Sequence, residues 1–284
     1  MSDTEEEAPP RSSRLSLIAQ APPPPSFLQS QVSSISTLIS ELGEIALLTG
    51  RSFRSLFKRP FEWPAFVYQL EAIGVQSTAI VAVTSIFIGM VMTIQFAYGL
   101  QRFGGVEYIP RVIVLSFMRE LAPTLMAVIV GGRVGSGMAA EVGAMNVTEQ
   151  VDAIRALGAD PAKKIVLPRM MAAIFALPVL ELVALSLGTL GAMLICSLEY
   201  NIQPRTFLQS SLETVRIGDL FAGIMKTPFF GYIISIVGCH FGLTTKGGTE
   251  GVGRSTTKTV VVVSIAILIA DFMLTKLFIA FGSA

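Results

Sequence analysis

Five stretches of the chain are apolar and long enough to cross a bilayer as helices. A transmembrane helix needs about 20 predominantly apolar residues, and each stretch reaches that length. The expected spans are residues 73–98, 112–140, 171–198, 217–243 and 259–281. The pattern therefore predicts an all-α polytopic membrane protein, with a five-helix transmembrane region across residues 73–281.

The segment before the first span, residues 27–60, has a helical period of its own. Apolar residues recur there at alternating spacings of four and three, which places them on one face of a helix opposite a polar face. They are Leu28, Val32, Ile35, Ile39 and Leu42, and a basic cluster follows them. We expect an N-terminal interfacial amphipathic helix in the cytoplasmic leaflet, where anionic lipids attract the basic cluster. Packing of this helix on another subunit is the alternative.

Residues 1–26 differ from the rest of the chain. They begin with acidic residues, end in a proline run at residues 22–25, and lack the basic region and apolar core of a signal peptide. Such a composition buries too little apolar surface to fold alone. We therefore expect a disordered, Pro-rich cytoplasmic tail at residues 1–26 and a membrane domain at residues 27–284.

The basic residues between the spans predict the orientation of the chain. Those expected on one side are Arg51, Arg54, Lys58, Arg59, Arg155, Lys163, Lys164, Arg169, Lys246, Arg254 and Lys258. The other side has only Arg102, Arg111, Arg205 and Arg216. Because positive residues concentrate in cytoplasmic loops, the N-terminus is predicted to be cytoplasmic and the C-terminus to lie outside.

The loop between the second and third spans predicts a short cytoplasmic helix at about residues 147–157. Asn146 as N-cap and Glu149 three residues later form a variant of the capping box. Gly158 suits the position after the helix, and Pro161 prevents its continuation. Such a helix, about 11 residues long, is marginal alone in water, so we expect packing to support it.

This short helix is a candidate coupling helix that docks a cytosolic motor domain. Val151 and Ile154 offer an apolar anchor, and Glu149, Asp152 and Arg155 surround it with charge. We expect these five residues to form the docking site.

Composition excludes several classes of function. The chain has 284 residues, of which 52% are hydrophobic and 14% charged, whereas soluble domains have about 25% charged residues. A net charge of +1 gives no reason to expect a nucleic acid partner. Cys196, Cys239 and the single His240 are too few for the usual zinc or thiol-redox sites, and no cofactor is expected. The two cysteines fall near opposite membrane faces, so we expect packing residues and no disulfide.

The stretch GGTEGVGRST at residues 247–256 resembles a phosphate-binding loop. Read from Gly248, it has the spacing G-x-x-x-x-G-R-S, with Arg254 in the position of the usual lysine. A phosphate-binding loop joins a buried strand to a helix, whereas both flanks here are membrane spans. We therefore predict a glycine-rich turn at residues 244–257 that binds no nucleotide, so that any ATP site must be on another chain.

Three ionisable residues fall inside the predicted spans. A charge in a bilayer costs at least about 2.5–3.5 kcal/mol and usually marks a buried pair or a pathway. Glu120, Lys226 and Asp271 are expected at matched depth in the middle to outer half of the membrane, where they can neutralise one another. This intramembrane network either fixes helix register or contacts lipid headgroups, and it could do both. A proton relay is a weaker third possibility.

Small residues recur every four positions in the second span, at Gly131, Gly135, Ala139 and Gly143. Such a stripe lets helix backbones approach closely, either within the chain or across a dimer interface. Arg133 and Glu141 on the same helix are expected near the cytoplasmic headgroups.

The run RELAPTLMAVIVGGRVGSGMAAEVGAMNVTEQVDAIRALGADP at residues 119–161 resembles the signature region of the MlaE/YrbE permease family. The later segments RSTTKTVV and DFMLTKLF agree with it. The resemblance implies a permease domain at residues 27–284, homodimeric and resident in the inner membrane, with a periplasmic C-terminus. It also implies two ABC ATPase subunits in the cytoplasm, a hexameric ring of MCE-domain proteins outside, and phospholipids or related lipids as substrate, moved between membranes.

Two other functions remain open from the residues alone. An intramembrane lipid-modifying enzyme could use Glu120 or Asp271 as an acid or base. A structural membrane scaffold would need no chemistry at all. The capped cytoplasmic helix favours a non-catalytic transporter subunit with ATP hydrolysis on a separate chain, because an enzyme has no need of such a helix.

Overall fold

The computed structural model describes residues 27–56 and 62–280, with side chains described from residue 40 in the first segment. Helix α2, Phe27–Leu56, covers most of the predicted interfacial segment. The predicted tail and the side chains of Leu28, Val32, Ile35 and Ile39 lie outside the described residues. The chain divides into two units between Glu44 and Ile45, and the second unit contains all the membrane helices.

Five helices long and apolar enough to cross a membrane confirm the predicted spans. The described residues form helices and no strand, as expected for an all-α polytopic membrane protein. The helical spans are Trp63–Gln101, Val106–Val147, Ala162–Glu199, Ile217–Leu243 and Gly248–Ala280. Most are longer than predicted because helical turns continue beyond the apolar stretches.

The first three spans are not uniform α-helices, because each contains a π-helical turn. The first comprises α3 Trp63–Leu70, η1 Glu71–Val75 and α4 Gln76–Gln101. The second comprises η2 Val106–Tyr108, α5 Ile109–Ser116, η3 Phe117–Leu121 and α6 Ala122–Val147. The third comprises η4 Ala162–Val166 and α8 Leu167–Glu199. Pro123 and Pro168 lie in the first turns of α6 and α8, directly after a π-helical turn.

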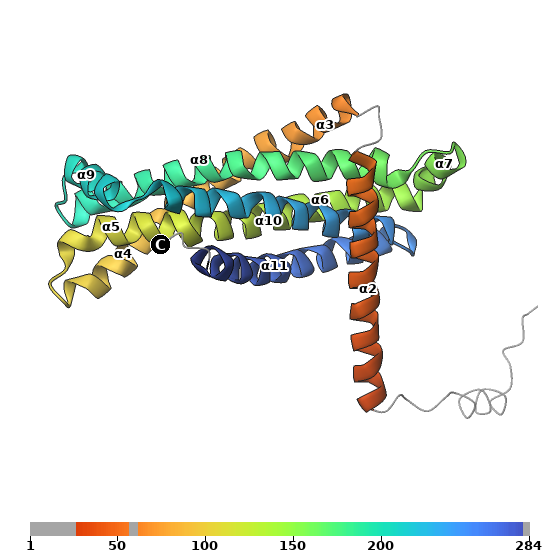
Figure 1. Ribbon diagram of the computed structural model, residues 1–284, viewed down its shortest axis with the longest axis horizontal. Coiled ribbons are helices and arrows are strands. Elements are labelled where there is room, and N and C mark those ends of the chain that lie inside the picture. The colour runs from red at the N-terminus through yellow and green to blue at the C-terminus, as the bar shows by residue number, and fades with distance from the viewer. Residues whose placement is uncertain (1–26, 57–61, 281–284) are drawn as a thin grey trace, which may run out of the picture. The chain divides into compact units, whose positions relative to one another are not determined.

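Helix α10, Ile217–Leu243, lies at the centre of the bundle (Figure 1). It packs on α6, α8 and α11 (Gly248–Ala280), while α4 packs mainly on α8. The short helices α7 (Gln150–Ala156) and α9 (Pro204–Thr214) lie at opposite ends of the bundle, called here the α7 end and the α9 end.

Glycines allow the helices to approach to backbone contact. A Cβ atom added to Gly89 of α4 would lie 2.1 Å from the carbonyl oxygen of Gly188 in α8. A Cβ atom on Gly238 of α10 would lie 2.8 Å from the carbonyl oxygen of Gly135 in α6. Larger residues at either position would push the helices apart.

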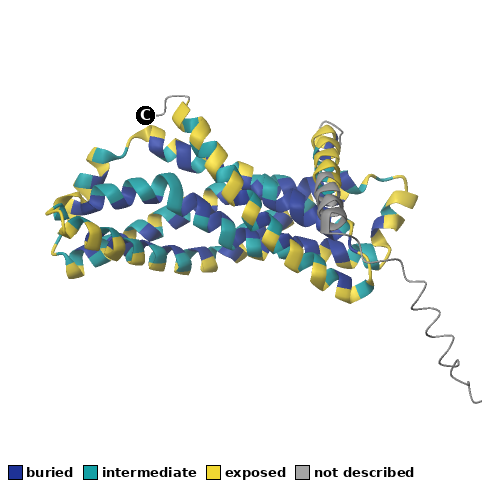
Figure 2. Cartoon of the chain, turned by 90° about the horizontal axis from the view of Figure 1, so that it is seen from below, coloured by how far each residue is buried: buried dark blue, intermediate teal, exposed yellow. Residues whose placement is uncertain are grey.

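Burial follows the helix contacts. Figure 2 shows buried residues where helices meet and exposed residues on their outward faces. Many exposed residues of the spans are large and apolar, including Phe87 of α4, Val179 of α8 and Phe272 of α11. Because lipid tails are as apolar as leucine, such faces suit contact with the bilayer. Cys196 and Cys239 are buried and unpaired, which confirms that they are packing residues.

The short helix between the second and third spans begins later than predicted. Helix α6 continues through Val147, so Asn146 is not an N-cap, and its side-chain amide donates to the Thr245 carbonyl at 3.0 Å. Helix α7 has seven residues, and Glu149 precedes it in a left-handed conformation without a side-chain capping bond. The predicted capping box was therefore wrong, because tertiary packing extends the preceding span.

The predicted end of the same helix is correct. Gly158 has a φ of +75°, and its N–H bonds the Arg155 carbonyl at 2.9 Å. The N–H of Ala159 bonds the Ile154 carbonyl at 3.1 Å. These two bonds form a Schellman motif, which favours glycine at this position.

The glycine-rich stretch is mostly helical, which corrects the predicted turn at residues 244–257. Gly247 and Gly248 have φ values of +90° and +65° and reverse the chain, and α11 begins at Gly248. The residues that resemble a phosphate-binding loop thus form the first turns of α11. Their N–H groups beyond the first turn bond within the helix, whereas a phosphate-binding loop points such groups at the ligand.

Candidate functional site

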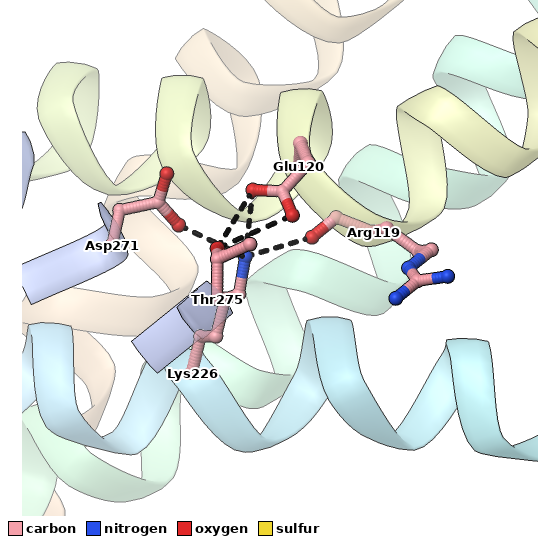
Figure 3. A network of polar contacts seen from close by, with 5 residues as sticks. All are labelled: Arg119, Glu120, Lys226, Asp271 and Thr275. Carbon is pink, nitrogen blue, oxygen red and sulfur yellow. Dashed lines mark hydrogen bonds and ion pairs between the residues drawn. The ribbon is translucent and has the colours of Figure 1, made fainter. Parts of the chain in front are cut away.

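Glu120, Lys226 and Asp271 come together from three helical elements, η3, α10 and α11 (Figure 3). The ammonium Nζ of Lys226 lies 2.7 Å from Oε2 of Glu120 and 3.0 Å from Oδ1 of Asp271. Residues separated by up to 151 positions in sequence thus share one ion-paired centre, the intramembrane network. The lysine is the shared partner of the two carboxylates.

Two neutral groups complete the surroundings of Lys226. Its Nζ donates to the Arg119 carbonyl at 3.0 Å and to Oγ1 of Thr275 at 2.8 Å. Thr275 in turn donates to Glu120 at 3.2 Å. The Arg119 carbonyl is available because Pro123, four residues later, lacks the N–H that it would receive in an α-helix. The π-helical turn and the proline therefore shape the site at the level of the backbone.

The three charged side chains differ in their access to the surroundings. The exposed fractions are 2% for Lys226, 17% for Asp271 and 40% for Glu120. Two carboxylates against one ammonium leave a formal excess of one negative charge when all are ionised. The carboxylate of Glu120, the most exposed of the three, can accept hydrogen bonds from a polar group outside the helix bundle. Lys226 must be uncovered before it can contact an anion.

A second ion pair lies beside the network. Arg119 Nη1 is 3.3 Å from Oδ1 of Asp219, whose other oxygen accepts from the backbone N–H of Arg216 at 3.0 Å. Sequence reasoning did not single out this pair. The signal was present, because Arg119 adjoins Glu120 and Asp219 lies at the start of an apolar run.

Glu181 of α8 was also missed. It is 1% exposed, and its Oε2 is buried without a hydrogen-bond partner in the described part of the chain. The criterion that found Glu120 would have found this acid as well, because it interrupts the apolar run LPVLELVALSL.

Replacement of Glu181 by methionine is expected to raise the free energy of unfolding by about 1–3 kcal/mol, because a buried polar atom without a partner is removed. Thermal unfolding of the purified protein measures the change. Glu199→Met is the control, since this glutamate lies at the end of the same helix and outside the buried core. A lower melting temperature for Glu181→Met alone would show that the carboxyl group stabilises the fold.

The candidate docking residues of α7 fall into two groups. Val151 is fully buried, and Ile154 packs partly against the same core, so both fasten α7 to its own chain. Asp152 and Arg155 are exposed and pair with each other at 2.7 Å. Leu157, directly after the helix, is 85% exposed and was not singled out from the sequence. Among the described residues of α7 and the turn after it, Leu157 is therefore the large apolar side chain that is exposed, whereas Val151 is covered.

The small-residue stripe of α6 packs within the chain. Gly131 and Gly135 face Ile234 of α10 and Val263 of α11, and Ala139 is fully buried. Gly143 lies against Thr245 at the α7 end. Of the two arrangements considered, the structure thus places the stripe at contacts between helices of one chain.

No group of three or more histidine, cysteine, aspartate or glutamate residues among residues 27–56 and 62–280 could hold a metal ion. The network itself pairs both of its carboxylates with the one lysine.

The family model described as Permease MlaE matches residues 66–277, which include the intramembrane network and α7. The chain belongs to the MlaE permease family. A probable ABC transporter permease protein of Synechocystis is 42% identical over 244 residues, which are 86% of this chain and 93% of the relative. One from Rickettsia typhi is 40% identical over 83% of this chain and 91% of the relative.

A chloroplast protein is similar to this MlaE-family permease over a comparable length. The protein trigalactosyldiacylglycerol 1 of Arabidopsis thaliana is 38% identical over 234 residues, which are 82% of this chain and 67% of the relative.

Proposed function

We propose that this permease is the membrane subunit of an ABC transporter that moves phospholipids or related lipids between inner and outer membranes. Its place in the MlaE permease family is the observation that supports this most strongly. Relatives named as probable ABC transporter permeases favour a motor on a separate chain, and the lipid name of the Arabidopsis relative favours a lipid cargo.

The proposed assembly is a homodimer with two ATPase subunits and a ring of MCE-domain proteins. The α7 end is the cytoplasmic end and the α9 end the periplasmic one, as the basic residues favour. In this orientation α2 begins in the cytoplasm, and α11 ends on the periplasmic side of the inner membrane. The exposed residues Asp152, Arg155 and Leu157 then face the ATPase.

The intramembrane network is proposed to contact lipid headgroups or to gate their path. The exposed carboxylate of Glu120 supports this role, because a group that serves only helix register has no need of access to the surroundings. The covered ammonium of Lys226 meets an anionic headgroup once ATP binding separates the helices that pair with it. Helix register alone is the competing role.

The purified chain without partners is expected to bind no ATP and to hydrolyse none. Arg254 is exposed and pairs with Glu250 on the first turns of α11, where no phosphate loop is formed. Equilibrium binding of labelled ATP is measured for the isolated chain and for the chain with its co-purified ATPase. The comparison tests whether the ATP site is on the separate chain. Saturable binding to the isolated chain that Arg254→Ala abolishes would overturn this expectation. Gentle extraction that yields no ATPase subunit would favour a scaffold or an enzyme.

A further inference from the structure

A polar cleft of about 280 Å³ lies between the first two spans, away from the intramembrane network. Residues of α3, η1 and α4 form one wall, and residues of α6 form the other. The polar lining residues are Gln69, Gln76, Arg133 and Glu141, and Ile73 and Met138 are among the apolar ones. Four of the nine lining residues are polar or charged, which suits a ligand with a polar or charged group.

Gln69 contributes a polar group to the cleft. The residue is only 7% exposed and lines the cleft, and its amide is not among the sealed-off polar atoms of the described chain, so it is open to the cleft. A polar group bound in the cleft can therefore exchange a hydrogen bond with this amide, which both donates and accepts.

Arg133 is held in place on the opposite wall. Its Nη1 donates to Oγ of Ser77 at 2.8 Å, and its Nη2 donates to Oε1 of Gln76 at 3.3 Å. A guanidinium has five N–H donors, so three remain, and no carboxylate pairs with this arginine in the described residues. A preorganised guanidinium with free donors suits a phosphate group.

Glu141 lies two helical turns from Arg133, about 12 Å along α6 toward the α7 end. Its Oε1 accepts from the buried Arg169 at 2.6 Å. The other carboxylate oxygen has no partner among the described residues, and half of the side chain is exposed. This oxygen can accept a hydrogen bond from an ammonium group.

We propose that the cleft binds the headgroup of an amine-bearing phospholipid from the cytoplasmic leaflet. The phosphate lies at Arg133, and the ammonium lies toward Glu141 and Gln69. The order agrees with a lipid in that leaflet, because the phosphate is nearer the bilayer centre than the amine. The inference rests on the proposed function for its orientation, and it adds a lateral loading site remote from Lys226.

The test titrates the purified full-length chain with short-chain phosphatidylethanolamine and counts bound lipid by native mass spectrometry. Arg133→Gln is expected to weaken binding about 10-fold or more, since charge-assisted hydrogen bonds to the phosphate are lost. Gln69→Met is expected to weaken binding because the cleft loses this amide, and the melting temperature, measured in parallel, shows that the variant is folded. Arg254→Gln, a change at an exposed arginine outside the cleft, leaves both quantities unchanged.

Two competing ligands identify the source of the phosphate. Phosphatidylglycerol, which lacks the amine, is expected to bind several-fold more weakly, and inorganic phosphate is expected not to displace the lipid. Equal affinity for both lipids, displacement by free phosphate, or unchanged binding in Arg133→Gln or Gln69→Met would overturn the proposal. Failure of the proposed function is distinct, because it would appear as absent ATP-driven transport by the wild-type complex.

Discussion

Lys226→Ala is expected to abolish lipid transport and to lower the free energy of unfolding by about 3–5 kcal/mol, the usual result of removing one partner of a buried ion pair. Glu120 and Asp271 would then share a low-dielectric site without their ammonium. At least one of them would take up a proton or draw in water. Thermal unfolding and ATP-driven transfer of a labelled phospholipid measure the two effects.

Lys276→Ala is the matched control for this change. Lys276 is exposed, follows Thr275 on α11, and makes no bond to the network in the described structure. Wild-type transport by Lys226→Ala would show that the buried charges have no essential role.

The triple variant Glu120→Met, Lys226→Met and Asp271→Leu separates register from headgroup contact. Replacing a complete buried ionic group by apolar residues of similar volume is often neutral or stabilising. Stability should therefore return in this variant. We expect transport to remain absent, because the groups that meet the headgroup are gone. Recovery of transport together with stability would show that the network serves only to fix helix register.

Leu157→Ala is expected to weaken ATPase association about 30-fold, as for an interface anchor worth about 2 kcal/mol. Arg155→Glu is expected to weaken it as well, because it places a second acid beside Asp152 on the exposed surface of α7. Membrane insertion and the melting temperature should not change, since neither side chain is buried. Co-purification of the ATPase at increasing salt measures the association.

The control for this pair is Leu212→Ala, which truncates another highly exposed leucine, on α9 at the other end of the bundle. Ile154→Ala is a poorer probe than the sequence indicated, because Ile154 packs on its own chain. Unchanged association in both Leu157→Ala and Arg155→Glu would exclude α7 from the motor interface.

The five spans were predictable because apolar length is a local property of the sequence. The meeting of Lys226 with Glu120 and Asp271 was predictable for a related reason. Charges are so costly in a bilayer that matched depth implies pairing. Position along a span was therefore enough to identify these partners without knowledge of helix packing.

Features that depend on packing were not predictable in this way. The Asn146 motif is a local signal for a helix start. In the fold, however, α6 continues through Asn146, and the side chain of Asn146 donates to the Thr245 carbonyl. Val151 has the pattern of a docking anchor, and only the tertiary structure shows that its own chain covers it. Nothing local places Gln69 and Arg133 in one cleft, because their proximity depends on how two spans pack.

The most direct measurement reconstitutes the permease with its co-purified ATPase in liposomes and follows transfer of a labelled phospholipid to an acceptor. Transfer is expected to require both ATP and this chain. Lys226→Ala is expected to abolish it, and Lys276→Ala is expected to leave it unchanged. Transfer at the same rate without ATP, or no transfer by a wild-type complex that hydrolyses ATP, would contradict the proposed function.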